Sequence, residues 1–168
     1  NAPYGIGTYA HVPFIGDDGR PSTGWHAEFG DIDNDGLADL FIAKGNVDQM
    51  PSNAIHDPNN LLMQRPDGTF VEVADTAGIA TVERSRGAAL ADLNGDGRLD
   101  IVVMNRRAPM EIWQNASKET GHWAGIEPVS NGNTRAIGAW VELRAGGRTQ
   151  AREITVGGGH AGGQAGPL

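Results

Sequence analysis

The 168-residue sequence contains no cysteine, which excludes disulfides, thiolate metal sites and cysteine nucleophiles. It also lacks any apolar run near the ~20 residues of a membrane-spanning helix, so we predict no membrane span. Positive charge is scarce: the formal net charge is −8, whereas nucleic acids and anionic membranes bind basic surfaces. We therefore predict no nucleic-acid partner. The sequence shows no signal peptide, as expected of a mature or excised chain.

Glycine, in contrast, is abundant at 25 residues, while aromatic residues make up only 6% of the chain. Short apolar runs between glycine-rich turns favour many short strands over long helices. The runs at 40–43 and 101–104 are typical of strands buried on both faces. The composition therefore predicts an all-β fold.

Two acidic loops lie 61 positions apart, a first loop at residues 31–39 and a second loop at residues 92–100. Each has an acid or amide at positions 1, 3 and 5, glycine at position 6 and aspartate at position 9. This spacing wraps oxygen ligands around one hard cation, and the glycine permits the tight curl. Position 7 would add its backbone carbonyl. We predict two calcium sites with these ligands: Asp31, Asp33, Asp35, Leu37 and Asp39, and Asp92, Asn94, Asp96, Arg98 and Asp100.

Other interpretations of the loops fit less well. An acidic turn held by Asx hydrogen bonds, without an ion, is the alternative for a single loop, but two matching copies favour metal. An EF-hand needs Glu at position 12, where this chain has Ile42 and Val103. All-oxygen ligands disfavour zinc, and magnesium prefers a smaller shell that retains water.

The segments around the loops also correspond, which indicates a repeat. Residues 24–30 and 85–91 lead into the two loops without a gap. We match the next strand at 61–64 to 111–114, so its glutamine follows the last loop aspartate by 25 residues in one copy and 14 in the other. The extra residues lie within 45–60, a polar surface loop of the kind that often carries specificity.

These observations divide the chain into four segments. We predict an N-terminal strand and loop segment at 1–23, a first repeat at 24–84, a second repeat at 85–115 and a β-rich C-terminal segment at 116–168. Turn signals at 65–69 and 145–148 predict hairpins. The segments 123–126 and 140–143 are predicted strands. The four tryptophans are most simply residues of the core or of packing between blades, and an exposed one could stack on a sugar.

The two repeats resemble FG-GAP/VCBS-type repeats, on the segments 29–41, 60–62, 67–70 and 89–102. The tail is similar to part of an ASPIC/UnbV domain, as found in cartilage-acidic-protein-like proteins, on 122–126, 135–139, 145–150 and 157–159. The family implies a calcium-binding β-propeller that is secreted, periplasmic or at the cell surface. Two blades cannot close a propeller, so other blades of a longer chain or a protein partner would complete it.

Three hypotheses for function follow. The first is a scaffold, adhesion or ligand-binding module in which calcium is structural. The second is a lectin-like or carbohydrate-active module that binds sugars through the 45–60 loop. The third is an enzyme that uses the metal as a Lewis acid. The sequence favours the first because no catalytic constellation stands out, and the G-x-G-x-x-G pattern at 157–162 lacks the following helix of a dinucleotide site.

The two loops differ in charge. The first has four carboxylates, whereas the second has Asn94 at position 3. We therefore predict that the second loop is the weaker calcium site.

Overall fold

The computed structural model describes residues 23–47, 55–118, 120–130, 135–157 and 159–163. The predicted N-terminal segment 1–23 lies outside these residues except for its last position, as does 48–54 in the middle of the 45–60 loop. In the described part of the chain no helix is long and apolar enough to cross a membrane.

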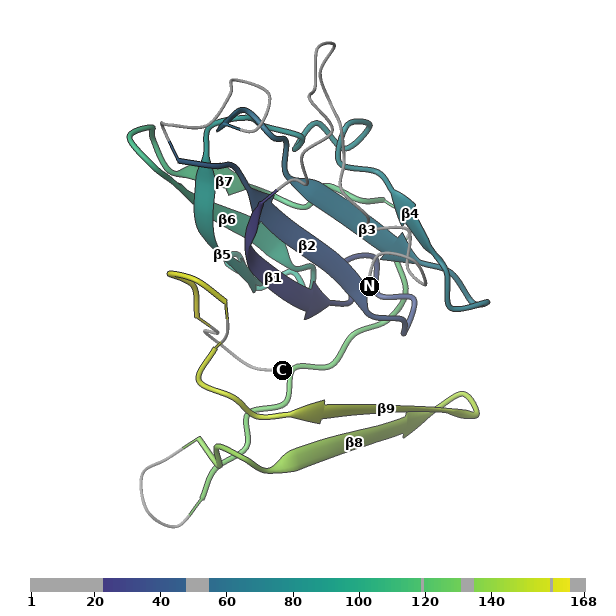
Figure 1. The fold of residues 1–168 in the computed structure, drawn as a ribbon. Helices are drawn as coiled ribbons and strands as arrows, with labels where there is room; N and C mark the ends of the chain where they lie inside the picture. The colour runs from purple at the N-terminus through teal and green to yellow at the C-terminus, as the bar shows by residue number, and fades with distance from the viewer. Residues whose placement is uncertain (1–22, 48–54, 119, 131–134, 158, 164–168) are drawn as a thin grey trace.

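The described elements are nine strands in three small antiparallel sheets, which confirms the all-β prediction (Figure 1). The first sheet has the order β1-β2-β3-β4 and the second the order β5-β6-β7, and β8 pairs with β9 as a hairpin. Among the described strands none of these sheets closes on itself. The strand bounds are β1 Gly24–Gly30, β2 Asp39–Lys44, β3 Asn60–Gln64, β4 Phe70–Glu72, β5 Ser85–Ala91, β6 Asp100–Asn105, β7 Glu111–Trp113, β8 Trp140–Ala145 and β9 Arg148–Glu153.

The first two sheets repeat the same arrangement, since β1 with β2 and β5 with β6 have the same register and a bulge at the same place. The match between 61–64 and 111–114 is wrong by one residue. Leu40 lies opposite Leu62, and its equivalent Ile101 lies opposite Trp113, so Gln64 corresponds to Asn115. Pairing between strands sets this register, and the unequal connections before β3 and β7 obscure it in the sequence.

The core lies between the two repeats, where β1 and β2 both pack against β5. Strand β2 is buried at five of its six positions, as its continuous apolar run predicts. Gly30 permits the close approach, because a Cβ there would lie 2.8 Å from a methyl carbon of both Leu90 and Leu99. The core side chains are Ile32, Phe41, Ala43, Leu61, Ala74, Ile79, Ala88, Leu90, Ile101 and Val103.

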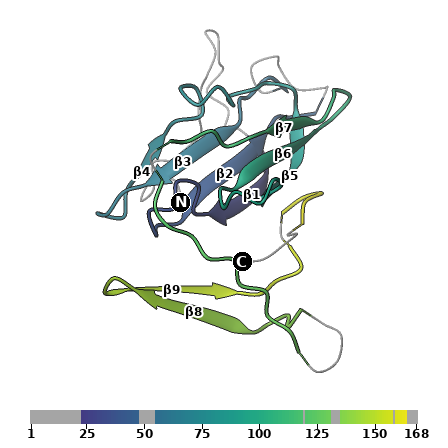
Figure 2. The same ribbon diagram turned by 180° about the vertical axis from the view of Figure 1, so that it is seen from behind.

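The chain after β7 runs without a described strand until β8, so the strand predicted at 123–126 is wrong (Figure 2). The side chain of Trp123 instead lies against Gly97 of the second loop. Trp123 and Trp140 are 55% and 67% exposed, so these two tryptophans are not core residues.

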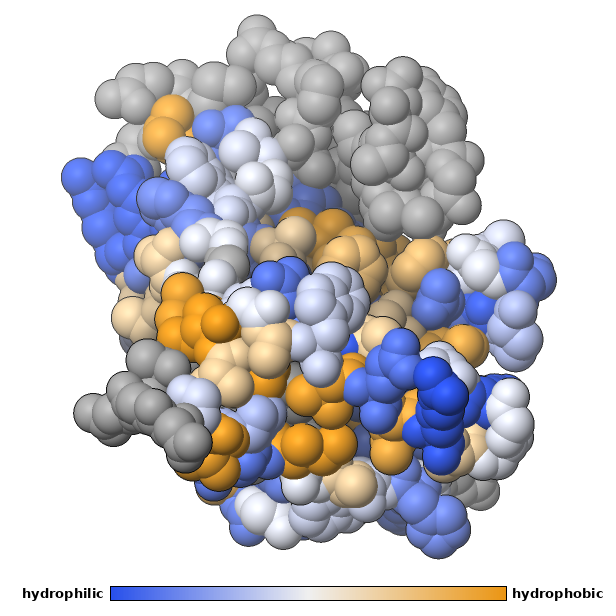
Figure 3. Space-filling model, turned by 90° about the horizontal axis from the view of Figure 1, so that it is seen from below, coloured by the Kyte–Doolittle hydropathy of each residue, from blue (hydrophilic) through white to orange (hydrophobic). Residues whose placement is uncertain are grey.

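The hairpin of β8 and β9 confirms the predicted turn, with Gly146 and Gly147 both at positive φ. Most residues of the hairpin are exposed. Figure 3 views the molecule from this side and shows apolar side chains gathered on it. The exposed large apolar residues in and beside the hairpin are Ile137, Trp140, Leu143 and Val156.

Candidate metal centre

The two acidic loops have the same backbone conformation. Positions 4 and 6 have positive φ in both: 57° at Asn34 and 86° at Gly36, then 76° at Gly95 and 81° at Gly97. Asparagine and glycine are the residues that adopt this region at least cost. The curl that the glycine at position 6 predicts is therefore present in both copies.

The aspartate at position 1 holds each curl closed. The carboxylate of Asp31 accepts the backbone N–H groups of Asp35 at 3.0 Å and Gly36 at 2.9 Å. Asp92 accepts the equivalent N–H groups of Asp96 at 3.1 Å and Gly97 at 2.7 Å. Position 1 thus fixes the turn and keeps lone pairs on its oxygens for a cation.

The aspartate at position 9 is a buried clamp in both copies. Asp39 accepts the N–H of Ile32 at 2.9 Å and that of Gln64 at 2.8 Å, one on each oxygen. Asp100 accepts the N–H of Leu93 at 3.1 Å and that of Asn115 at 2.8 Å in the same way. The first clamp ties its loop to the last residue of β3, and the second ties its loop to the chain two residues after β7.

In the first loop three carboxylates converge. Asp31, Asp33 and Asp39 can each place one oxygen so that all three lie within 4.8 Å of one another. Burial raises the pKa of Asp39 to about 6, and it also raises the pKa values of Asp31 and Asp33. Repulsion between neighbouring carboxylates adds to these shifts. The cluster is thus short of positive charge.

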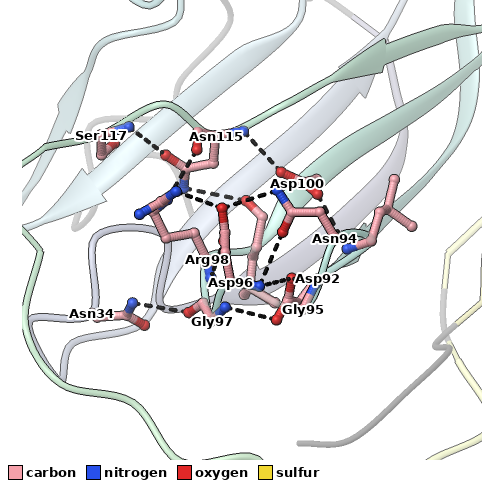
Figure 4. Close-up of polar contacts among 12 residues, drawn as sticks. Asn34, Asp92, Asn94, Gly95, Asp96, Gly97, Arg98, Asp100, Asn115 and Ser117 are labelled. Atoms are coloured by element: carbon pink, nitrogen blue, oxygen red, sulfur yellow. Dashed lines mark hydrogen bonds and ion pairs between the residues drawn. The ribbon is translucent and has the colours of Figure 1, made fainter.

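In the second loop, side chains of the loop itself donate hydrogen bonds to the Asp96 carboxylate (Figure 4). Asn94 stands at position 3 and donates from its amide to Asp96 at 2.9 Å. The Arg98 guanidinium also donates to Asp96, and its Nε donates to the Asn115 carbonyl at 3.0 Å. Burial opposes a lower pKa at Asp96, but the hydrogen bonds from Asn94 and Arg98 outweigh it and lower the pKa. A cation from the protein itself therefore lies on this loop.

The first loop fits a calcium ion. Calcium–oxygen distances are about 2.3–2.6 Å, so two ligand oxygens lie at most ~5 Å apart, and the three convergent carboxylates meet this limit. The three would contribute hard oxygen ligands and neutralise the ion. In the second loop Asp92, Asn94 and Asp100 occupy the equivalent positions.

The remaining predicted ligands are placed as follows. Asp35 is exposed and accepts the N–H of Leu37 at 2.8 Å, and it lies outside the group of three carboxylates. Asp96 accepts the N–H of Arg98 at 3.0 Å in the same way. Ligation through the carbonyls of Leu37 and Arg98 stays a prediction.

The loops touch each other and the C-terminal segment, which sequence reasoning missed. Asn34 donates to the Gly97 carbonyl at 3.0 Å, and the Asn115 amide donates to the Ile32 carbonyl at 2.8 Å. From β9, Arg148 donates to the Asp35 carbonyl at 2.7 Å. A cavity of about 380 Å³ lies between both loops, Trp123 and the hairpin. These contacts are between distant parts of the chain, and no local pattern signals them.

Two known families match parts of this chain. A family model described as an FG-GAP-like repeat matches residues 50–103, which include the second loop, and a model described as ASPIC and UnbV matches residues 129–168. The chain therefore carries an FG-GAP-like repeat followed by an ASPIC/UnbV segment, as the resemblance indicates.

Particular relatives come from vertebrates. Cartilage acidic protein 1 of Xenopus tropicalis is 36% identical over 85 residues, which is 50% of this chain and 12% of that protein. The Homo sapiens protein of the same name is 44% identical over 61 residues, or 36% of this chain and 9% of that protein. The chain thus spans about a tenth of the length of the curated relatives that it matches.

Proposed function

We propose that this chain is part of an extracytoplasmic calcium-binding β-propeller that serves as a scaffold, adhesion or ligand-binding module, with calcium in a structural role. The observation that carries the proposal is the convergence of Asp31, Asp33 and Asp39 within 4.8 Å at the junction of loop and strand. A cation there would offset repulsion and desolvation in one step, and it would brace the first loop against β2 and β3.

The propeller part of the proposal is supported by the repeat. Two sheets with the same register pack against each other through β1, β2 and β5, as adjacent blades do. Closure would need further blades from a longer chain or from a partner protein. The extracytoplasmic location is supported by the name of the relatives, cartilage acidic protein 1, and by the calcium supply outside cells.

Sugar binding through the 45–60 loop stays a prediction. Residues 48–54 lie outside the described residues, and the exposed tryptophans that could stack on a sugar, Trp123 and Trp140, belong to the C-terminal segment.

The test is a thermal melt of the protein after chelation and again with added calcium, together with elemental analysis before chelation. We expect bound calcium in the untreated protein and a higher melting temperature with calcium. At ten times the dissociation constant, one site adds about 1.4 kcal/mol to the free energy of unfolding.

Matched variants locate the effect. Asp33→Asn removes one charge of the cluster and should weaken calcium binding, whereas Asp75→Asn, at an exposed position outside both loops, should not. A protein without calcium by elemental analysis, and with the same melting temperature in chelator and in calcium, would contradict the proposal.

A further inference from the structure

A lysine and an aspartate form a buried ion pair at the end of β2, away from the acidic loops. The Lys44 Nζ lies 2.9 Å from the Asp57 Oδ1, and their side chains are 2% and 1% exposed. Among the described residues the Lys44 Nζ has this one ion-pair partner. The calcium proposal makes no use of this pair.

Hydrogen bonds of Asn59 fix the Lys44 backbone and the chain two residues after Asp57. The Lys44 N–H donates to the Asn59 Oδ1 at 2.9 Å, and the Asn59 N–H donates to the Thr81 carbonyl at 3.1 Å. The Asn59 amide also donates to the Thr81 hydroxyl at 3.0 Å. Lys44 is the last residue of β2 and Asp57 lies three residues before β3, so both are attached to paired strands.

The environment disfavours the charged state of the pair. Removing two ions from water costs several kcal/mol for each ion, and this cost can exceed the attraction between them. Burial lowers the pKa of Lys44, although the charges of Asp57 and Glu72 oppose the shift. A proton passed from Nζ to the carboxylate would give a neutral amine beside a neutral carboxylic acid, and both are tolerated better in an apolar site.

We propose that Lys44 and Asp57 condense to an intramolecular amide bond. After the proton transfer, the Nζ lone pair attacks the Asp57 Cγ, and the C–O bond to the protonated oxygen breaks. The nitrogen gives one of its two remaining protons to the departing hydroxyl, which leaves as water, and keeps the other as the amide N–H. One amine and one carboxylic acid thus become one amide and one water, with no oxidant or reductant.

Three features favour this reaction here over the same reaction in water. The reacting groups are already in contact, and fixed neighbours of this kind react at effective molarities of about 10⁵–10⁸ M when aligned. The ionised state that makes condensation unfavourable in water is penalised by burial. The burial of both side chains also limits the return of water to the amide.

The product would be a covalent bridge across the base of the 45–60 loop. It would join the end of β2 to the chain that enters β3, independently of calcium. The loop could then vary or be cleaved while its two ends stayed together.

The experiment is peptide mapping of the purified, denatured protein after acylation of its free amines. Lys44 and Lys118 are the two lysines of the sequence, and a protease that cleaves after glutamate releases them in peptides 29–72 and 112–119. We expect peptide 29–72 to lack one water and to carry no acyl group on Lys44. Lys118 should be fully acylated and serves as the internal control.

Acid cleavage of the chain is a second readout, and it tests whether the water was lost from the Asp57 carboxyl. The sequence has a single Asp–Pro bond, between Asp57 and Pro58, and dilute acid cleaves such bonds through the aspartate carboxyl. An amide on that carboxyl should block the cleavage. Succinimide formation at Asp57 is excluded as a source of the lost water, because Pro58 has no backbone N–H.

Lys44→Arg keeps a cation but cannot condense, so its peptide should have the full mass and its Asp–Pro bond should cleave. If this variant fails to fold, the mapping of the unaltered protein still decides. Full mass, acylated Lys44 and cleavage at Asp57 in the unaltered protein would show a plain ion pair and overturn the proposal.

Discussion

The side-chain amide of Asn34 donates a 3.0 Å hydrogen bond to the carbonyl oxygen of Gly97, 63 positions along the chain. Position 4 of the first loop therefore touches position 6 of the second loop. On the same glycine lies the indole of Trp123 from the C-terminal segment. The conformation of one loop is thus coupled to that of the other and to the segment that covers them.

Gly97→Ala should disturb this junction more than Gly95→Ala does. Both glycines have positive φ, which costs alanine about 1–2 kcal/mol. A Cβ at Gly95 would meet open space, whereas a Cβ at Gly97 would collide with the Trp123 indole. We expect a further loss of stability, and a change in tryptophan fluorescence, only for Gly97→Ala. Equal losses in chemical denaturation of the two variants would contradict the contact.

Asp39 should matter to folding even without a metal. Its carboxylate accepts two backbone N–H groups while 1% exposed, so Asp39→Ala would leave both donors without their acceptor. An unsatisfied buried donor costs about 1–3 kcal/mol, so the calcium-free protein should lose several kcal/mol in urea denaturation. Asp35→Ala is the matched control: it removes one exposed acceptor of the Leu37 N–H, so the calcium-free protein should lose much less stability. A calcium-free Asp39→Ala protein as stable as the parent would refute the clamp.

The stability of the calcium-free protein should fall as pH rises from about 4 to 7. The pKa of Asp39 is raised from 3.8 to about 6, so between these values the folded state binds more protons than the unfolded state. By linkage the free energy of unfolding then decreases with pH, by roughly 2–3 kcal/mol from this group. Saturating calcium should remove the decrease, because the ion replaces the protons. The measurement is a urea titration at several pH values with chelator and with calcium. A calcium-free stability that rises with pH across this window would contradict the shift.

Arg98→Gln should strengthen calcium binding at the second loop. The guanidinium donates to Asp96, and its charge would repel a cation on the same loop. We expect a several-fold lower dissociation constant for the weaker of two calcium sites in calorimetry, with the tighter site unchanged. Arg65→Gln, at an exposed hairpin position, is the control. Tighter binding in Arg65→Gln as well would show a general effect of net charge.

The features that the sequence predicted correctly depend on the conformational preferences of nearby residues. The curl of each loop follows from glycine at position 6, and the hairpins follow from Gly68, Gly146 and Gly147, all at positive φ. The apolar run 40–43 became the buried strand β2 because continuous apolar runs suit strands covered on both faces.

The features that the sequence did not predict depend on contacts formed only in the folded chain. The pairing of Ile101 with Trp113 is set by the β6 and β7 backbones, and it shifted the predicted match by one residue. Arg98 was expected to offer only its carbonyl, but its side chain bonds Asp96, because both project from the same tight curl. The burial of Lys44 against Asp57 likewise depends on packing that no periodicity reveals.

The difference in connection length between the copies has a consequence for how such repeats can diverge. The aspartate clamp bonds a residue 25 positions ahead in the first copy and 15 ahead in the second. The ten added residues leave the acidic end unchanged, since both clamps make the same two bonds. The end of each repeat that carries the acidic loop therefore keeps the same hydrogen bonds, while the connection at the opposite end can differ in length. A library of inserts between positions 47 and 55 would test whether this end of the repeat accepts new recognition surfaces while the aspartate clamp is retained.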